Sequence, residues 1–259
     1  MNVDSILQYC MEKQGAYLDY PFGDIPVCVK VCGKIFAEIY PNPDNYKITL
    51  KCEPMLADFY RQQYEGTVVR GYHCPPVQQP YKNTIYIDRI EEDVLLNMID
   101  HSYERAILNL SKKVRNSLIG NIDRKTLIAK GAIVLDNIEQ GFESYRHEIL
   151  EGTKEQLLVW IKELRDRNGI EDSYVDLYYG SLLPEEKERV CNNLTEEGLR
   201  ILNRYAPWRE VLILPLDDEL LRLTEELNTK EALFSTYYFC KYPCSVWGNY
   251  ERKYPRFWK

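Results

Sequence analysis

The fold of the chain is decided by a stretch near its start, residues 25–52, which reads IPVCVKVCGKIFAEIYPNPDNYKITLKC. β-Branched and aromatic residues dominate three segments of this stretch, Ile25–Val31, Ile35–Tyr40 and Tyr46–Cys52. Turn-forming residues separate the segments, namely Cys32-Gly33-Lys34 and then Pro41 to Asn45. Because short connections of this kind join neighbouring antiparallel strands, the stretch predicts an antiparallel meander.

Helix and strand signals surround this meander. Before it, Asp4 can cap an amphipathic helix, and after it Pro54 suits the first turn of a second helix. Two more strand patterns follow at Thr67–Tyr72 and Thr84–Asp88. Apolar residues then recur at helical spacing from Glu91 to about Ser117, which predicts one long helix. The first part of the chain is therefore expected to be an α+β domain in which helices pack on an antiparallel sheet.

The pattern changes near Leu118, so we expect one domain at 1–118 and a second at 119–259. In the second half, helical periodicity covers Asp123–Gln140, Thr153–Asn168 and Asp217–Asn228. Only Trp208–Leu214 has the pattern of a strand. The second domain is therefore predicted to be mainly α-helical.

Composition limits the class of protein. The 259 residues are 45% hydrophobic and 28% charged, which is typical of a folded globular chain. No apolar run approaches the roughly 20 residues that a membrane-spanning helix needs, and the N-terminus lacks a secretory signal pattern. We therefore expect a cytoplasmic protein with no membrane partner. The chain also has 21 Tyr against 7 Phe, an aromatic set suited to surfaces and clefts as well as to cores.

Metal and cofactor signals are weak. Eight cysteines are spread along the chain, and the pairs Cys28/Cys32 and Cys240/Cys244 have three residues between them, where structural zinc sites usually have two. The three histidines lie far apart in the sequence. We therefore expect reduced thiols, no metal site and no cofactor.

Five blocks in the first half resemble the MmcQ/YjbR family in order and spacing. They are Pro21-Phe22-Gly23, Lys30 to Ala37, Leu50 to Pro54, Gly71-Tyr72-His73 and Ser102-Tyr103. The resemblance covers about residues 1–118 and does not extend to the second half. It implies a CyaY-like α+β fold and carries the family's label of a DNA-binding protein, which rests on analogy of fold. The sequence departs from the family in one place, because Cys74–Pro80 is rich in Pro and Gln where the family has a basic segment containing Trp.

Net charge argues against a uniformly basic nucleic-acid binder. The formal charge is −7, and residues 1–119 contain 13 basic and 15 acidic residues. A local basic segment nevertheless runs from residue 105 to residue 130, with one acidic residue, Asp123. Its members are the candidate nucleic-acid-binding residues Arg105, Lys112, Lys113, Arg115, Arg124, Lys125 and Lys130. They could contact phosphates, or they could complement a helix C-terminus and a solvated linker.

A second candidate site combines residues from expected strand ends. Lys34, Lys51, Tyr72 and His73 could converge on one side of the sheet and hold an anionic ligand. The alternative is that Tyr72 packs in the core while the lysines solvate strand edges. The neighbouring Cys74 suggests a nucleophile, but adjacent strand residues point to opposite faces, which places a thiol and an imidazole poorly for proton exchange.

Two functions remain open from the sequence. The first is a non-enzymatic binding module of the MmcQ/YjbR type with DNA as its partner. The second is a protein-interaction or small-ligand-binding module that uses a tyrosine-rich surface and has no affinity for nucleic acid. A protein partner would then contact the aromatic C-terminal region, Phe239–Lys259. No catalytic residue is assigned, so an enzyme is the less favoured class.

Overall fold

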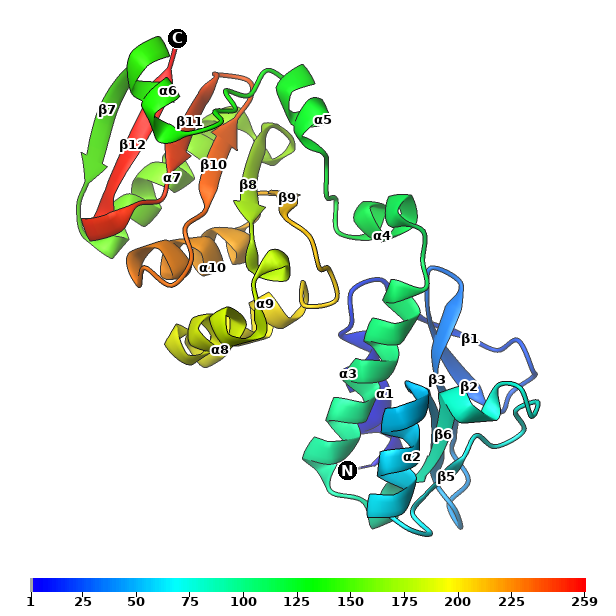
Figure 1. The fold of residues 1–259 in the computed structure, drawn as a ribbon. Helices are drawn as coiled ribbons and strands as arrows, with labels where there is room; N and C mark the ends of the chain where they lie inside the picture. Colours follow the sequence, from blue (N-terminus) through cyan, green and yellow to red (C-terminus); the bar gives the residue numbers. More distant parts are fainter. Residues whose placement is uncertain (1) are drawn as a thin grey trace. The chain divides into compact units, whose positions relative to one another are not determined.

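The computed structural model describes residues 2–259, and the chain forms two compact units, residues 1–118 and 119–259 (Figure 1). Each unit has its own antiparallel sheet and its own helices. The α+β class predicted for the chain is confirmed. Within the described residues, no helix combines the length and the apolar character that crossing a membrane requires.

The N-terminal unit is built on a six-stranded sheet in the order β1-β2-β3-β4-β6-β5. All neighbouring strands are antiparallel, and the predicted meander is β2, β3 and β4. The strands are β1 (Ala16–Asp19), β2 (Val27–Val31), β3 (Lys34–Tyr40), β4 (Lys47–Lys51), β5 (Val68–Arg70) and β6 (Lys82–Tyr86). Sequence reasoning did not identify β1.

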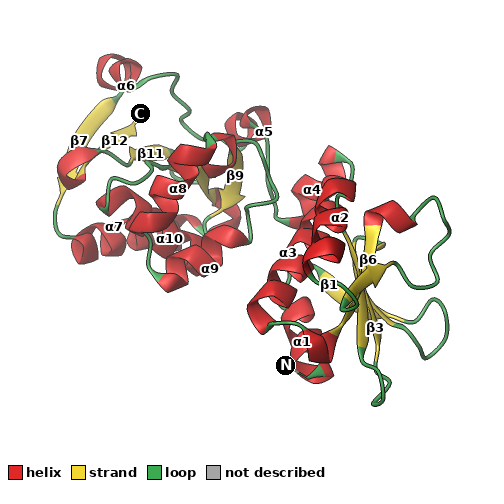
Figure 2. Cartoon of the chain, turned by 60° about the horizontal axis from the view of Figure 1, so that its bottom comes forward, coloured by secondary structure: helices red, strands yellow, loops and turns green. Residues whose placement is uncertain are grey.

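Helices cover one face of this sheet and lie beside its strands in Figure 2. They are α1 (Val3–Met11), α2 (Pro54–Gln63) and α3 (Glu92–Leu108), followed by the short α4 (Lys112–Leu118). Ala37, Ile39 and Ile48 are fully buried in this unit, as is Ile99 of α3. Full burial of an aliphatic side chain contributes about 1.5–3 kcal/mol, so these contacts hold the helices on the sheet. Within residues 2–118, no α-helix covers the opposite face of the sheet.

The long helix predicted over Glu91–Ser117 is divided in two. The side-chain amide of Asn109 donates to the backbone carbonyl of Arg105. The Ser111 hydroxyl accepts a hydrogen bond from the backbone amide of Val114. Asparagine and serine side chains compete with helical hydrogen bonding in this way. As a result, α3 ends at Leu108 and α4 begins at Lys112.

The second unit corrects the prediction of a mainly helical domain. It contains a six-stranded antiparallel sheet in the order β7-β12-β11-β10-β8-β9. The strands are β7 (Arg146–Glu151), β8 (Ser173–Leu177), β9 (Leu212–Pro215), β10 (Thr236–Phe239), β11 (Cys244–Trp247) and β12 (Lys253–Trp258). Every residue of β8 and β10 is buried, so neither strand shows the alternation of apolar and polar residues by which strands are recognised. The second unit is therefore also α+β.

Two helices of the second unit match the expected ranges Thr153–Asn168 and Asp217–Asn228 to within about one residue at each end. The helices of this unit are α5 (Arg124–Ala129), α6 (Ile138–Ser144), α7 (Lys154–Asn168), α8 (Pro184–Asn193), α9 (Glu196–Asn203) and α10 (Asp218–Thr229). A capping box between Thr153 and Gln156 stabilises the N-terminus of α7. The single helix predicted over Asp123–Gln140 is instead α5 and α6, joined by an extended segment that contains the buried Ile133 and Leu135.

The tyrosines of the C-terminal region belong mainly to the core. Tyr237, Tyr238 and Tyr254 are buried in β10 and β12, whereas Tyr242 and Tyr250 remain exposed. The hydroxyls of Tyr237 and Tyr254 each donate to the buried carboxyl of Glu225 on α10, at 3.2 Å. The aromatic C-terminal segment is therefore a structural part of the second sheet.

Candidate functional site

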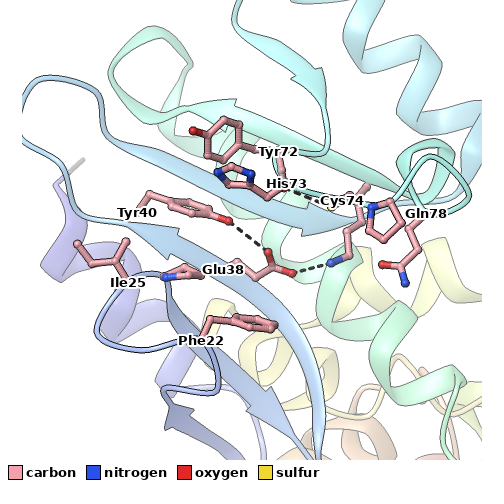
Figure 3. Close-up of a pocket in the computed structure, with 11 residues that line it drawn as sticks. Phe22, Ile25, Glu38, Tyr40, Tyr72, His73, Cys74 and Gln78 are labelled. Carbon is pink, nitrogen blue, oxygen red and sulfur yellow. Dashed lines mark hydrogen bonds and ion pairs between the residues drawn. The ribbon is translucent and has the colours of Figure 1, made fainter.

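A pocket lies on the helix-free face of the N-terminal sheet (Figure 3). Its volume is about 720 Å³, and its floor includes Glu38 and Tyr40 of β3 and Lys82 of β6. Two connecting segments complete the walls, residues 22–26 before β2 and residues 72–78 between β5 and β6. The remaining lining residues are Phe22, Ile25, Pro26, Tyr72, His73, Cys74, Pro75 and Gln78.

The second wall is held close to the sheet by backbone contacts. The amide of Gly71 donates to the carbonyl of Lys82, and the amide of Tyr72 donates to the Thr84 hydroxyl at 2.7 Å. A β-carbon at Gly71 would lie 2.8 Å from Cys74 Sγ and 2.9 Å from Lys82 Cβ, so only glycine fits there. This close approach explains why a glycine precedes the Tyr72-His73 pair.

An ion pair forms the polar centre of the pocket. Lys82 Nζ lies 2.6 Å from Glu38 Oε1, and the Tyr40 hydroxyl lies 3.5 Å from Glu38 Oε2. The Glu38 side chain is only 9% exposed and that of Lys82 18%. Lys82 reaches across β4 to Glu38, since β4 lies between β3 and β6 in the sheet. A carboxylate this deeply buried needs compensation by a cation or by hydrogen-bond donors, and here Lys82 supplies the cation.

Aromatic rings surround the ion pair. The rings of Tyr40 and Tyr72 meet edge to face with their centroids 5.6 Å apart, and the ring of His73 lies 4.0 Å from that of Tyr72. The ring of Phe22, 64% exposed, lies on the other side of Glu38 in the view of Figure 3. Burial and then the charge of Glu38 raise the pKa of Tyr40, so its hydroxyl stays protonated and can donate a hydrogen bond.

Cys74 is poorly suited to act as a nucleophile. Burial is the largest influence on the Cys74 thiol and raises its pKa, although the nearby Lys82 acts in the opposite direction. The Sγ atom donates to the carbonyl of Tyr72 at 3.4 Å. Among the described residues, no hydrogen bond joins Cys74 to His73. Because the thiolate is the reactive form, this environment favours an inert thiol.

The structure brings together only part of the predicted anion site. Tyr72 and His73 line the pocket, but Lys34 and Lys51 do not. Lys51 lies directly opposite Lys82 in the β4–β6 register. Burial lowers the pKa of Lys51, and the neighbouring Lys82 and Lys34 lower it further. Lys34 and Lys51 therefore raise the positive potential beside the pocket without forming its surface.

Sequence reasoning missed the two charged residues at the centre of the pocket. Glu38 lies in the alternating segment IFAEIY and Lys82 in a segment expected to be a loop. One signal was present, because a glutamate at an alternate position within an apolar strand must face away from the core. Its partner could not be inferred, since Lys82 is 44 residues further along the chain.

The candidate nucleic-acid-binding residues are divided between the two units. Arg105 lies on α3, while Lys112, Lys113 and Arg115 lie on α4. The other three belong to the second unit, where Arg124 pairs with Asp136, and Lys130 Nζ lies 3.1 Å from Asp172 Oδ1. Lys125 is exposed on α5. Two of the three cations in the second unit are thus engaged by carboxylates.

Comparisons with known proteins concern the N-terminal unit. Residues 11–105 match the model of the YjbR family. The uncharacterised protein YjbR of Escherichia coli, from strain K12 and from O157:H7, is 28% identical over 120 residues, which are 46% of this chain and 98% of the relative. The N-terminal unit is therefore a domain of the YjbR family, as its five sequence blocks predict.

Two solved structures are also similar to part of the chain. One is the Deinococcus radiodurans protein DR2400, a DUF419 domain, with 22% identity and a TM-score of 0.41. It aligns with 45% of this chain and 87% of its own. The other is a protein from Pseudomonas syringae with 18% identity and a TM-score of 0.35, covering 41% of this chain and 99% of its own.

Proposed function

We propose that the N-terminal unit is a non-enzymatic binding module that takes a small organic ligand in the pocket between residues 22–26 and 72–78. The observation that carries this proposal is the Lys82–Glu38 ion pair, which is buried at the centre of a cavity of about 720 Å³ and flanked by aromatic rings. Small-molecule sites typically measure about 300–1,000 Å³ and combine apolar walls with a few convergent polar groups.

The lining residues fit binding better than catalysis. The Cys74 thiol is buried with a raised pKa, and the Tyr40 hydroxyl stays protonated. Lys82 Nζ is held 2.6 Å from Glu38 Oε1, so the group is engaged in an ion pair and is poorly placed to attack a substrate. These groups can donate and accept hydrogen bonds to a ligand while remaining chemically unchanged.

The test is a fragment screen by saturation-transfer NMR on the full chain and on the Gln78→Trp variant. Gln78 is an exposed lining residue, so tryptophan at this position can fill the pocket without disturbing the core. The matched control is Gln62→Trp, an exposed position on α2 outside the pocket. We expect fragments that bind the wild type and the control and do not bind Gln78→Trp. Binding that is unaffected by Gln78→Trp, or a complete lack of binders, would overturn the proposal.

A second candidate function is DNA binding, and one observation favours it. The last 14 residues of the N-terminal unit, 105–118, contain four basic residues and no acidic residue. Lys112 and Lys113 are both exposed at the start of α4. A surface of this kind can contact phosphates without reading sequence.

Fluorescence anisotropy with duplex and single-stranded DNA tests this second candidate. Replacing Lys112, Lys113, Arg124 and Lys125 together by Gln should weaken binding and reduce the slope of log K against log salt by about 0.9 for each phosphate that is no longer neutralised. The control carries the same change in charge elsewhere on the surface, at Lys154, Lys162, Arg189 and Lys241. Equal slopes for the two variants, or no binding by the wild type at low salt, would exclude the basic segment as a DNA site.

A further inference from the structure

We propose that the pocket recognises a zwitterion with adjacent ammonium and carboxylate groups and an aromatic side chain, that is, an aromatic α-amino acid. This inference rests on the proposed function and names the chemical class of its ligand. Its basis is the juxtaposition of an acid and a base in contact, Glu38 and Lys82, on the floor of an otherwise aromatic and apolar cavity (Figure 3).

The charges of the lining residues restrict the charge of the ligand. Glu38 and Lys82 are the charged residues that line the cavity, so the described lining is formally neutral. A ligand with a single charge would match one member of the pair and repel the other in a poorly solvated site. A ligand with both charges can place its ammonium group on Glu38 and its carboxylate on Lys82. Each ligand charge then lies against its opposite, and the site stays neutral.

The pair also has free hydrogen-bonding capacity. Within residues 2–259, the hydrogen bond that Glu38 Oε2 accepts is the long 3.5 Å contact with the Tyr40 hydroxyl, and a carboxylate oxygen can accept two hydrogen bonds. An ammonium group can therefore bind Oε2 without displacing Lys82 from Oε1. The ammonium of Lys82 has three donors, and its contacts with Glu38 and with the Cys74 sulfur use two of them. One donor is left for a carboxylate.

The field around the pair also differs between its two ends. Lys51 lies opposite Lys82 on the neighbouring strand, and Lys34 is also close enough to affect the pKa of Lys51. The Lys82 end is therefore more positive than the pair alone would make it, which favours the ligand carboxylate there. The Glu38 end is bordered by the rings of Tyr40 and Phe22, whose π faces attract an ammonium group. The two ends of the pocket thus differ in the direction that a zwitterion requires.

The shape of the walls favours a flat side chain. Phe22 lies on one side of Glu38, and the rings of Tyr72 and His73 lie on the other (Figure 3). Tyr72 is 41% exposed and Phe22 64%, so the rings still have free surface. Aromatic pairs prefer centroid separations of about 4.5–7 Å and gain stability beyond area burial. A flat side chain that enters between these walls would cover ring surface that now faces water.

The experiment is isothermal titration calorimetry of the full chain with three indole compounds that differ in the charged groups they carry. The first is L-tryptophan, the second is tryptamine, which lacks the carboxylate, and the third is indole-3-propionic acid, which lacks the ammonium group. Because a hydrogen bond to a charged group is worth about 1.5–3 kcal/mol, each analogue should bind at least about tenfold more weakly than L-tryptophan.

Variants then locate the binding. The double variant Glu38→Gln/Lys82→Met removes both charges together and leaves no buried unpaired charge, and it should reduce L-tryptophan affinity at least about tenfold. The matched control is Asp19→Asn/Lys30→Met, which removes a second lysine–carboxylate pair of the same sheet, 2.5 Å apart and outside the pocket. This control should bind as the wild type does. A thermal unfolding curve for each variant confirms that it is folded.

The outcomes separate this inference from the proposed function. Equal affinity for L-tryptophan and either analogue, unchanged affinity in Glu38→Gln/Lys82→Met, or no binding of L-tryptophan, L-tyrosine or L-phenylalanine would overturn the amino-acid class. If fragments still bound the wild type and failed to bind Gln78→Trp, the binding module would stand while its ligand class was wrong. If neither the amino acids nor any fragment bound, both proposals would fail.

Discussion

Glu38 of the N-terminal unit and Glu225 of the C-terminal unit are both buried, and their carboxyl groups are held in different ways. Glu38, whose side chain is 9% exposed, belongs to the N-terminal unit and pairs with Lys82 beside an open cavity. Glu225 is fully buried in the C-terminal unit and accepts hydrogen bonds from Tyr237 and Tyr254. The first carboxylate is compensated by a charge and the second by neutral hydroxyls. Burial consequently raises the pKa of Glu225 to about 7, although the two tyrosine hydrogen bonds act in the opposite direction.

This difference explains how the tyrosine-rich composition is used. In the C-terminal unit, tyrosine hydroxyls satisfy buried carboxyls, and Tyr238 does so for Asp176 at 2.9 Å. In the N-terminal unit, Tyr40 and Tyr72 line a cavity and keep part of their surface accessible. The same residue type therefore completes a closed core in one unit and the wall of a pocket in the other.

The largest expected effect contrasts two tyrosines. Tyr237→Ala removes a fully buried ring and one hydrogen bond of Glu225, so it should lower the free energy of unfolding by about 3–5 kcal/mol. Tyr72→Ala removes a ring that is 41% exposed and should cost no more than about 1 kcal/mol. Urea denaturation followed by circular dichroism measures both. Similar decreases in the two variants would contradict the distinction between a core tyrosine and a pocket tyrosine.

The next effect is the pH dependence of the stability of the C-terminal unit. The pKa of Glu225 is about 7 in the folded chain against an ordinary value of 4.5, so the folded state binds the proton more tightly than the unfolded state. The free energy of unfolding should therefore fall as pH rises from about 4.5 to 7, by roughly 3 kcal/mol in total. Burial likewise raises the pKa of Asp176, to about 6, which acts with the same sign.

Tryptophan fluorescence isolates this effect, because all four tryptophans belong to residues 119–259. Urea titrations at pH 5 and pH 8 should show a loss of stability in the wild type. The Glu225→Gln variant keeps a hydrogen-bonding side chain of the same size without a titratable proton, and it should lose less stability over this range. If Glu225→Gln retained the full pH dependence, the buried carboxyl would not be its source.

A smaller effect separates the charges of the pocket. Lys82→Met leaves Glu38 without its cation and should cost about 2 kcal/mol, less than the 3–5 typical of fully buried pairs because both side chains keep some exposure. The double variant Glu38→Gln/Lys82→Met should recover much of that stability, since no charge remains unpaired. Differential scanning calorimetry of the full chain compares the two variants. A double variant less stable than Lys82→Met would show that the pair itself stabilises the fold.

The smallest effect belongs to the Lys30–Asp19 pair of the same sheet, whose carboxylate is more exposed than that of Glu38. Lys30→Met breaks the contact with Asp19, whose side chain is 42% exposed. Pairs in water gain little and are screened by salt, so the melting temperature should change less than in Lys82→Met. Calorimetry at low and high salt tests this ranking, and an equal or larger change in Lys30→Met would reverse it.

Local signals made the first sheet predictable. The meander was recognisable because β2, β3 and β4 follow one another, with the turns at Cys32-Gly33 and Pro41–Asn45 between them. The second sheet was harder to predict, although β10, β11 and β12 also follow one another in it. Its edge strand β7 pairs with β12 about a hundred residues later, as in the register of Arg146 with Trp258. Pairings of such long range cannot be inferred from periodicity.

The candidate site was predictable only where it follows the chain. Tyr72 and His73 stand next to each other in a family block, and both line the pocket. Glu38 and Lys82 meet only because β3, β4 and β6 are neighbours in the sheet. Lys34 and Lys51 carry the right charge, but the strand register places them beside the pocket and outside its lining. Residue type was therefore an adequate guide to chemistry and a poor guide to position.

The most direct test of the binding module is the mapping of a bound ligand on the full chain by NMR amide shifts. The compound that binds most tightly among the indoles and fragments described above would be titrated into labelled protein. The account predicts that the perturbed amides cluster in residues 22–25, 38–40 and 72–78, around the cavity. Shifts concentrated on α4, or on the buried Glu225 and its tyrosines, would contradict it.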